Sequence, residues 1–213
     1  MKKPSISIID YGFGNLYSLV KALAHLGAAP IITKMPDEIE HADAVFLPGV
    51  GAFGRGMAEF TRRGFADPLK TYVASGKPLF GICLGMQFLF DNSEEFGVHQ
   101  GLGLLRGGVT KIVPREKHCK IPHIGWNELR FPPGISGWDG TILEGLGERE
   151  QAYFVHSYAV NPSDIKNTVA TTEYCGTSFA SVVEKGEIVG TQFHPEKSGA
   201  VGLHLLKNFL KRI

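Results

Sequence analysis

The chain has 213 residues, a length that predicts one domain over residues 1–213 and leaves no room for two enzymatic domains. Hydrophobic residues make up 43% of the sequence and charged residues 20%, which indicates a folded protein with a large core and excludes a disordered or fibrous chain. The formal net charge is +1. The sequence therefore lacks the basic excess that a nucleic acid or an anionic membrane surface would require of a partner.

The cysteines indicate the compartment. Cys83, Cys119 and Cys175 are odd in number and lack Cys-x-x-Cys spacing, which argues against a disulfide framework and against a structural zinc site. The longest apolar stretch, 78–86, is well short of the roughly 20 residues that cross a bilayer. We therefore expect a cytoplasmic protein that binds no membrane, no metal and no cofactor.

In chain order, the first hundred residues alternate between apolar runs and amphipathic segments. Buried strands are predicted at 5–9, 44–47 and 78–82. Helices are predicted at 16–26, from the end of a 48–56 loop through Val73, and from Leu84 through Phe90. Strands that are buried on both faces and alternate with helices predict an α/β fold with a mostly parallel central sheet and helices on both faces.

After about residue 105 the pattern changes to strands with few helices between them. Strands are predicted at 109–113, 153–160, 168–174, 178–185 and 187–193, with a surface loop at 131–140 and a closing helix at 201–210. We expect antiparallel pairing in this half of the chain.

The strongest chemical signal is Gly81-x-Cys83-x-Gly85, at the junction of a predicted strand and helix. This is the cysteine version of a nucleophile elbow, in which flanking glycines let neighbouring backbone pack closely around a strained turn. The positive end of the following helix dipole would stabilise the attacking thiolate. The alternative is a small apolar cysteine in a buried strand.

A second signal, His194-Pro195-Glu196, follows the last predicted strand. In extended backbone, residues two apart point to the same side, so His194 and Glu196 can face one site. A cysteine nucleophile needs a base, and the base needs an acceptor that fixes its tautomer. Alone, the pair is typical of a solvated loop; together with the elbow it predicts a Cys83, His194 and Glu196 triad.

The third element is the glycine-rich segment Pro48-Gly49-Val50-Gly51, at the end of another predicted strand. The oxyanion formed on attack needs two donors, of which the elbow supplies the N–H of Leu84. The backbone of Gly49 to Gly51 is the candidate for the other donor. An ordinary strand-to-helix turn and a phosphate cradle are the alternatives.

With these motifs together, the sequence resembles the class I, triad-type glutamine amidotransferases, whose Gly-x-Cys-x-Gly-x-Gln elbow pairs with a downstream His-Pro-Glu. Within that class it is similar to the glutaminase subunits of imidazole glycerol phosphate synthases, which serve histidine biosynthesis. The segments that carry this closer resemblance are 10–15, 48–51, 122–127, 153–158 and 193–198. The resemblance implies the three-layer, flavodoxin-like fold of this family.

The resemblance also assigns residues to roles. It implies that glutamine is bound by Gln87, Glu95 and the backbone near Gly51, Ser157 and Tyr158, and we assign Gly49 to the same set. From the elbow described above, we assign the oxyanion hole to Gly51 and Leu84. The resemblance implies that Trp126, Asn127, Tyr153 and Lys197 lie towards a partner interface. Each has a plainer alternative: Glu95 would suit a solvated acidic turn, and Trp126 and Tyr153 would suit a core. His156 lacks a carboxylate two residues on, and we interpret it as structural.

The implied reaction is hydrolysis of glutamine to glutamate and ammonia through a thioester on Cys83. The implied partner is a (β/α)8-barrel cyclase subunit, in a heterodimer, that consumes the ammonia and makes imidazole glycerol phosphate and an aminoimidazole carboxamide nucleotide. From the glycines flanking Val50 we expect that the oxyanion loop flips when the partner is loaded. The alternatives are the glutaminase of another synthase, a γ-glutamyl hydrolase on the same fold, and a catalytically silent binding subunit.

Overall fold

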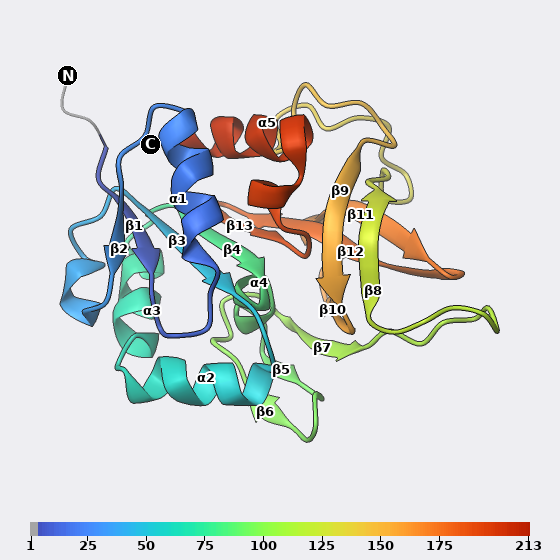
Figure 1. Cartoon of the computed structure of the whole chain (residues 1–213), viewed down its shortest axis with the longest axis horizontal. Coiled ribbons are helices and arrows are strands. Elements are labelled where there is room, and N and C mark those ends of the chain that lie inside the picture. Colours follow the sequence, from blue (N-terminus) through green and yellow to red (C-terminus); the bar gives the residue numbers. More distant parts are fainter. Residues whose placement is uncertain (1–3) are drawn as a thin grey trace.

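A seven-stranded sheet runs through the computed structural model, which describes residues 4–213 (Figure 1). Its strand order is β11-β12-β13-β4-β3-β1-β2. The strands are β1 (Ile6–Ile9), β2 (Pro30–Thr33), β3 (Ala44–Gly49), β4 (Leu79–Cys83), β5 (Asn92–Ser93), β6 (His99–Gln100), β7 (Gly107–Lys111), β8 (His123–Glu128), β9 (Gln151–His156), β10 (Tyr158–Pro162), β11 (Thr168–Tyr174), β12 (Thr177–Lys185) and β13 (Ile188–Thr191). The helices are α1 (Leu16–His25), α2 (Phe53–Arg62), α3 (Ala66–Ala74), α4 (Leu84–Phe88) and α5 (Gly199–Leu210), with short 3-10 turns η1 (Pro36–Glu38), η2 (Ile165–Asn167) and η3 (Pro195–Lys197).

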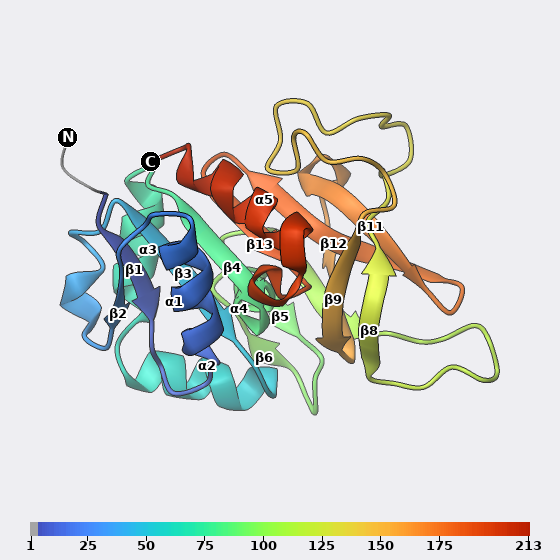
Figure 2. The ribbon, with the colours of Figure 1, turned by 45° about the horizontal axis from the view of Figure 1, so that its top comes forward.

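The central strands are parallel and covered on both faces. β2, β1, β3, β4 and β13 pair in parallel, and β12 and β11 extend the sheet in antiparallel fashion. α1 and α5 cover one face of the sheet (Figure 2). On that face, Phe209 packs edge-on against Phe46 and Phe80. α2, α3 and α4 bury their apolar sides against the other face. This three-layer architecture confirms the predicted fold class and carries the ends of β1, β3 and β4 to one edge.

The second half of the chain forms two smaller sheets beside the large one. β10, β7, β5 and β6 make a four-stranded sheet, and β8 pairs with β9 in an antiparallel ribbon. The predicted strand at 153–160 is therefore two strands, because the chain leaves one sheet for the other at Ser157. The strands β2, β5, β6 and β8 were not predicted. The predicted helix through Val73 is also two helices, separated at Gly64, which has a φ of +80°.

The predicted surface loop at 131–140 is partly buried. Trp138 is 3% exposed and donates its indole N–H to the carbonyl oxygen of Val169 at 3.0 Å. Its ring packs edge-on against Phe131. Trp138 therefore anchors this surface loop to edge strand β11, while residues 133–137, 139 and 140 are exposed as predicted.

The interpretation of the cysteines was wrong for two of the three. Cys119 and Cys175 form a disulfide, and Cys83 is the free, buried cysteine. The pairing arises because the 113–120 segment folds back onto the β11–β12 turn, where the N–H of Arg115 donates to the carbonyl oxygen of Cys175. Cysteine spacing alone does not reveal such a contact between segments distant in the sequence.

No helix among residues 4–213 is long and apolar enough to span a membrane.

Candidate active site

Cys83 occupies a strained turn between β4 and α4. Its φ of +53° and ψ of −109° are unusual for a residue with a side chain. Such strain persists only where the surrounding structure enforces it, and it is typical of nucleophile elbows. α4 has only five residues, so the dipole at Cys83 sums over few peptide units and is weaker than the sequence suggested.

The two glycines of the elbow are required by close backbone packing. A Cβ added at Gly85 would collide with the carbonyl oxygen of Leu47, on neighbouring β3. A Cβ added at Gly81 would lie 2.9 Å from the carbonyl oxygen of Gly85. Both glycines therefore allow β4, β3 and α4 to meet tightly enough to form the turn.

His194 and Glu196 form a buried pair directly after β13. Nδ1 of His194 lies 2.8 Å from Oε1 of Glu196, and each side chain is 4% exposed. Because a carboxylate only accepts, Nδ1 carries the proton and Nε2 is free to act as a base. Burial alone would lower the pKa of His194, but its interactions with the Cys83 thiol and the Glu196 carboxylate outweigh burial and raise it.

Most of the predicted site residues line one cavity of about 220 Å3 at the carboxyl ends of the parallel strands. The predicted residues that line it are Gly51, Cys83, Leu84, Gln87, Glu95, Ser157, Tyr158 and His194. Gly49 does not line it, and instead packs against the Tyr11 hydroxyl and Leu84. The cavity is smaller than sites for drug-sized ligands and suits a small metabolite.

Two of the lining residues also hold the cavity wall. Gln87 donates its amide hydrogens to the carbonyl oxygen of Tyr158 at 3.0 Å and to Oε1 of Gln192 at 3.2 Å, which leaves its own carbonyl for a ligand. Glu95 accepts from the backbone N–H of Phe53, the first residue of α2, at 2.5 Å. Glu95 is therefore not in a solvated acidic turn.

Sequence reasoning missed two residues that contact the triad. Gln192 is fully buried, and its Nε2 lies 3.7 Å from the sulfur of Cys83. The Ser198 hydroxyl donates to the carbonyl oxygen of His194 at 2.7 Å and accepts from the N–H of Tyr153 at 2.9 Å. Ser198 thus ties β9 to the backbone of His194.

In the glycine-rich loop at 48–51, the N–H group of Val50 points away from the cavity. The N–H of Val50 donates to the carbonyl oxygen of Phe13 at 2.9 Å, and Gly51 has a φ of +97°. Beneath the loop, the Tyr11 hydroxyl is buried without a hydrogen-bond partner among residues 4–213, and burial raises its pKa. The Val50 donor is therefore not directed at Cys83 in this conformation.

The residues predicted for a partner interface lie outside the cavity, on β8, β9 and η3. Trp126 is 54% exposed and stands opposite Tyr153 in the β8–β9 register, with ring centroids 6.2 Å apart. The ammonium nitrogen of Lys197 lies over the Tyr153 ring, 6.0 Å from its centroid. Ile124, two residues before Trp126, is 59% exposed. Trp126 is therefore not a core aromatic residue.

Comparison with known proteins identifies the class that this fold and site define. Residues 7–213 match the family model for class-I glutamine amidotransferases. Among solved structures, PurLQS from Thermotoga maritima superposes with a TM-score of 0.74 at 22% identity, over 99% of both chains. A structure described as a glutamine amidotransferase superposes with a TM-score of 0.73 at 19% identity, over 98% of this chain and 99% of that one. These identities are low and show the fold alone.

Sequence relatives narrow the family further. Imidazole glycerol phosphate synthase subunit HisH 1 of Legionella pneumophila (strain Lens) is 45% identical over 211 residues, which are 97% of this chain and 99% of the relative. The HisH subunit of Geobacillus kaustophilus is 46% identical over 208 residues, or 96% and 95% of the two chains. The chain belongs to the class-I glutamine amidotransferases and, within them, to the family of HisH subunits of imidazole glycerol phosphate synthase.

Proposed function

We propose that this chain hydrolyses glutamine to glutamate and ammonia and delivers the ammonia to a cyclase subunit in histidine biosynthesis. The observation that carries the proposal is the strained free cysteine at the same cavity as a buried, carboxylate-paired histidine. That combination is the minimum for covalent acyl transfer by a thiol. No metal or cofactor has a role in this chemistry.

The proposed reaction has two halves. The Cys83 proton passes to Nε2 of His194, and the sulfur attacks the side-chain amide carbon of glutamine. The tetrahedral intermediate collapses as the C–N bond breaks, and the imidazolium gives its proton to the leaving ammonia. His194 then takes a proton from water, which attacks the γ-glutamyl thioester and releases glutamate and the thiol. Glu196 stabilises the imidazolium in both halves through its 2.8 Å contact with Nδ1.

The proposed oxyanion hole combines the N–H of Leu84 with a donor from the Gly49 to Gly51 backbone. The Val50 N–H is held by Phe13, so it can serve as this donor only after the peptide before Val50 turns over. Glycines on both sides of Val50 permit such a rotation. This arrangement supports a resting state with an incomplete oxyanion hole, which the loaded partner would complete.

Glutamine itself is assigned to the cavity, where Gln87, Glu95 and the backbone at Ser157 and Tyr158 surround Cys83. Gly49 is assigned a supporting role at most, since it stands behind the cavity wall. The substrate side chain would reach Cys83, and its α-amino and α-carboxyl groups would meet the polar groups at the cavity mouth.

The proposed partner is a (β/α)8-barrel cyclase subunit, docked as a heterodimer on the β8–β9 ribbon. Ammonia released into neutral water would be protonated and lose its nucleophilicity, so transfer needs a dry path to a second site. Exposed Ile124 and Trp126 give this ribbon the apolar centre that such interfaces use, and Asn127, Tyr153 and Lys197 are assigned to the same interface. Neither nucleic acid nor membrane is a proposed partner, and the proposed compartment is the cytoplasm.

The test compares glutamine and ammonia as nitrogen donors for the chain in complex with its cyclase. Cys83→Ala should abolish glutamine-dependent product formation and leave ammonia-dependent formation unchanged. Glutamine-dependent formation that survives in Cys83→Ala would show that the triad assignment is wrong. Full-speed hydrolysis of glutamine or γ-glutamyl peptides by the isolated chain would favour an independent hydrolase instead.

A further inference from the structure

Two buried histidines lie between the exposed β8–β9 ribbon and the glutamine cavity. His123 on β8 stands opposite His156 on β9, and the two are 2% and 6% exposed. Nδ1 of His123 lies 3.1 Å from Nε2 of His156. Neither ring belongs to the triad, and His156 lines the cavity.

The hydrogen bonds at both ends determine which nitrogens carry protons. Nδ1 of His156 lies 2.9 Å from the carbonyl oxygen of Tyr158, which only accepts, so this nitrogen is protonated. Nε2 of a neutral His156 must then accept, which makes Nδ1 of His123 the donor. Nε2 of His123 accepts from Nδ2 of Asn127 at 3.2 Å. The side chains therefore form one directional chain from Asn127 to Tyr158.

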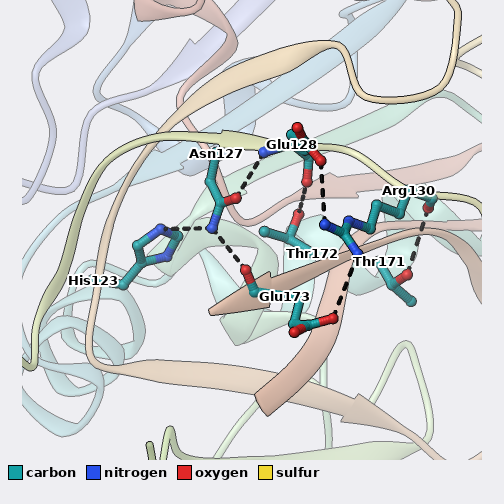
Figure 3. A network of polar contacts seen from close by, with 7 residues as sticks. All are labelled: His123, Asn127, Glu128, Arg130, Thr171, Thr172 and Glu173. Atoms are coloured by element: carbon teal, nitrogen blue, oxygen red, sulfur yellow. Dashed lines mark hydrogen bonds and ion pairs between the residues drawn. The ribbon is translucent and has the colours of Figure 1, made fainter. Parts of the chain in front are cut away.

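The orientation of Asn127 is fixed independently, as Figure 3 shows. Its Nδ2 also donates to the carbonyl oxygen of Glu173 at 2.9 Å, and its Oδ1 accepts from the N–H of Glu128 at 2.8 Å. β8 is further held to β11 by Thr172, whose hydroxyl donates to the carbonyl oxygen of Glu128. Asn127, the first donor in this series of hydrogen bonds, thus belongs to β8, the strand whose Trp126 side chain is exposed.

The last acceptor belongs to the glutamine cavity. The carbonyl oxygen of Tyr158 accepts from His156 and from Gln87, so protein donors fill both of its lone-pair directions. These two bonds set the backbone at the start of β10, next to Ser157. Loss of the His156 bond would release one side of this segment.

The surroundings keep both imidazoles neutral. His123 is packed between Phe154 and His156 of β9, Tyr174 of β11 and Phe179 of β12. The titratable groups that face the pair are the Tyr174 phenol, which donates to the carbonyl oxygen of Lys120, and His194, whose charge acts on His156. Burial lowers the pKa of His123 to about 4 and is the main cause that lowers the pKa of His156 to about 3.

We propose that His123 and His156 are positioning residues: with Asn127 they form a proton-ordered relay that sets the glutamine-binding backbone at Tyr158 from the partner-facing strand β8. The inference rests on the proposed glutaminase function and deepens it. When the partner docks on β8, a shift of Asn127 changes which nitrogens donate, and the Tyr158 carbonyl gains or loses its His156 donor. Neither ring exchanges a proton with glutamine.

The decisive variant is Asn127→Asp, which keeps the shape of the side chain but replaces the donor to His123 by an acceptor. A neutral His123 must then protonate Nε2, so Nδ1 becomes an acceptor and His156 must move its proton from Nδ1 to Nε2. We expect the glutamine KM of the complex to rise about 10-fold at pH 8 with kcat within about twofold.

Nitrogen-15 spectra of the imidazole rings in the full-length protein show which ring nitrogens carry protons. If the two histidines only packed the core, Asn127→Asp would not change these proton positions. Both rings of the wild type should be protonated at Nδ1 alone, and Asn127→Asp at pH 8 should move the His156 proton to Nε2. A wild-type His156 protonated at Nε2 would overturn the relay whether or not the variant folds. So would an unchanged KM in a variant that binds the cyclase normally.

Thr172→Val is the matched control, because it removes a β8–β11 bond of Figure 3 without touching the imidazoles. Its glutamine KM should stay within about twofold of wild type; a rise equal to that of Asn127→Asp would assign the effect to strand displacement and overturn the relay. If the wild-type complex itself showed no glutamine-dependent turnover, the glutaminase function would be contradicted instead. Failure of the two proposals is therefore distinguishable.

Discussion

The side-chain nitrogen of Gln192 lies 3.7 Å from the sulfur of Cys83, and its side-chain oxygen accepts from Gln87. Gln192 is fully buried directly after β13, two residues before His194. It therefore contacts the nucleophile on one side and the cavity wall on the other. An amide donor next to a sulfur stabilises the thiolate more than the thiol.

We predict that Gln192→Leu lowers kcat for glutamine about 10-fold to 100-fold. The substitution removes the donor to the sulfur and leaves Gln87 without its acceptor, so kcat should fall and KM should rise modestly. Steady-state glutaminase kinetics in the complex measure the effect. Ammonia-dependent activity is the control and should not change; a kcat equal to wild type would show that the contact has no catalytic role.

We predict that Gly85→Ala destabilises the fold by about 3 kcal/mol or more, because the new methyl group would overlap the carbonyl oxygen of Leu47. Gly147→Ala is the matched control, since no heavy atom lies within 4 Å of a Cβ there. Urea unfolding followed by circular dichroism measures both. Equal unfolding midpoints for the two variants would contradict the packing argument for the elbow.

We predict that the protein loses stability as the pH falls from about 6.5 towards 4. The pKa of His123 is about 4 and that of His156 about 3 in the folded chain, so the unfolded chain binds more protons in this range. Each histidine should contribute a loss on the order of 2 kcal/mol between pH 7.5 and pH 5, so the two together should give about 4 kcal/mol. Urea unfolding of Cys83→Ala measures it without the Cys83–His194 interaction, and a flat profile would contradict it.

We predict that reduction of the Cys119–Cys175 disulfide lowers the free energy of unfolding by about 2 to 4 kcal/mol, because the bond closes a loop with a sequence separation of 56. The doubly substituted chain, Cys119→Ser with Cys175→Ser, should match the reduced wild type and should not respond to reductant. The expected cytoplasmic location favours reduced Cys119 and Cys175, whereas the structure contains the disulfide between them. Counting alkylated cysteines in freshly lysed cells would decide between them: one for the bond, three for free thiols.

The elbow was predictable because its information is local. Gly81, Cys83 and Gly85 lie within five residues, and the glycines are needed for contacts that any strand-to-helix turn of this kind makes. The same holds for His194 and Glu196. Gln192 could also have been found, since it precedes His194 by two residues in a predicted strand and so faces the same side.

The relay and the disulfide were not predictable from the sequence. His123 and His156 are 33 residues apart, and their contact depends on the register of β8 and β9, which no local pattern fixes. β8 itself contains a glycine with a φ of +137° and alternates weakly in polarity, so it was not identified as a strand. Cys119 and Cys175 meet only because the 113–120 segment returns to the β11–β12 turn.

The Cys119–Cys175 disulfide closes a covalent ring that contains some elements of the fold and leaves others outside. The ring that it closes contains β8, β9, β10 and β11, whereas Cys83 and His194 lie outside it, on opposite sides in the sequence. A protease that cuts once within the exposed part of the 131–150 loop would therefore leave two fragments, one with the thiol and one with the imidazole, still joined through sulfur. Such nicked protein would run as a full-length band on a gel until reductant was added, and its active-site halves would stay tethered across the cut.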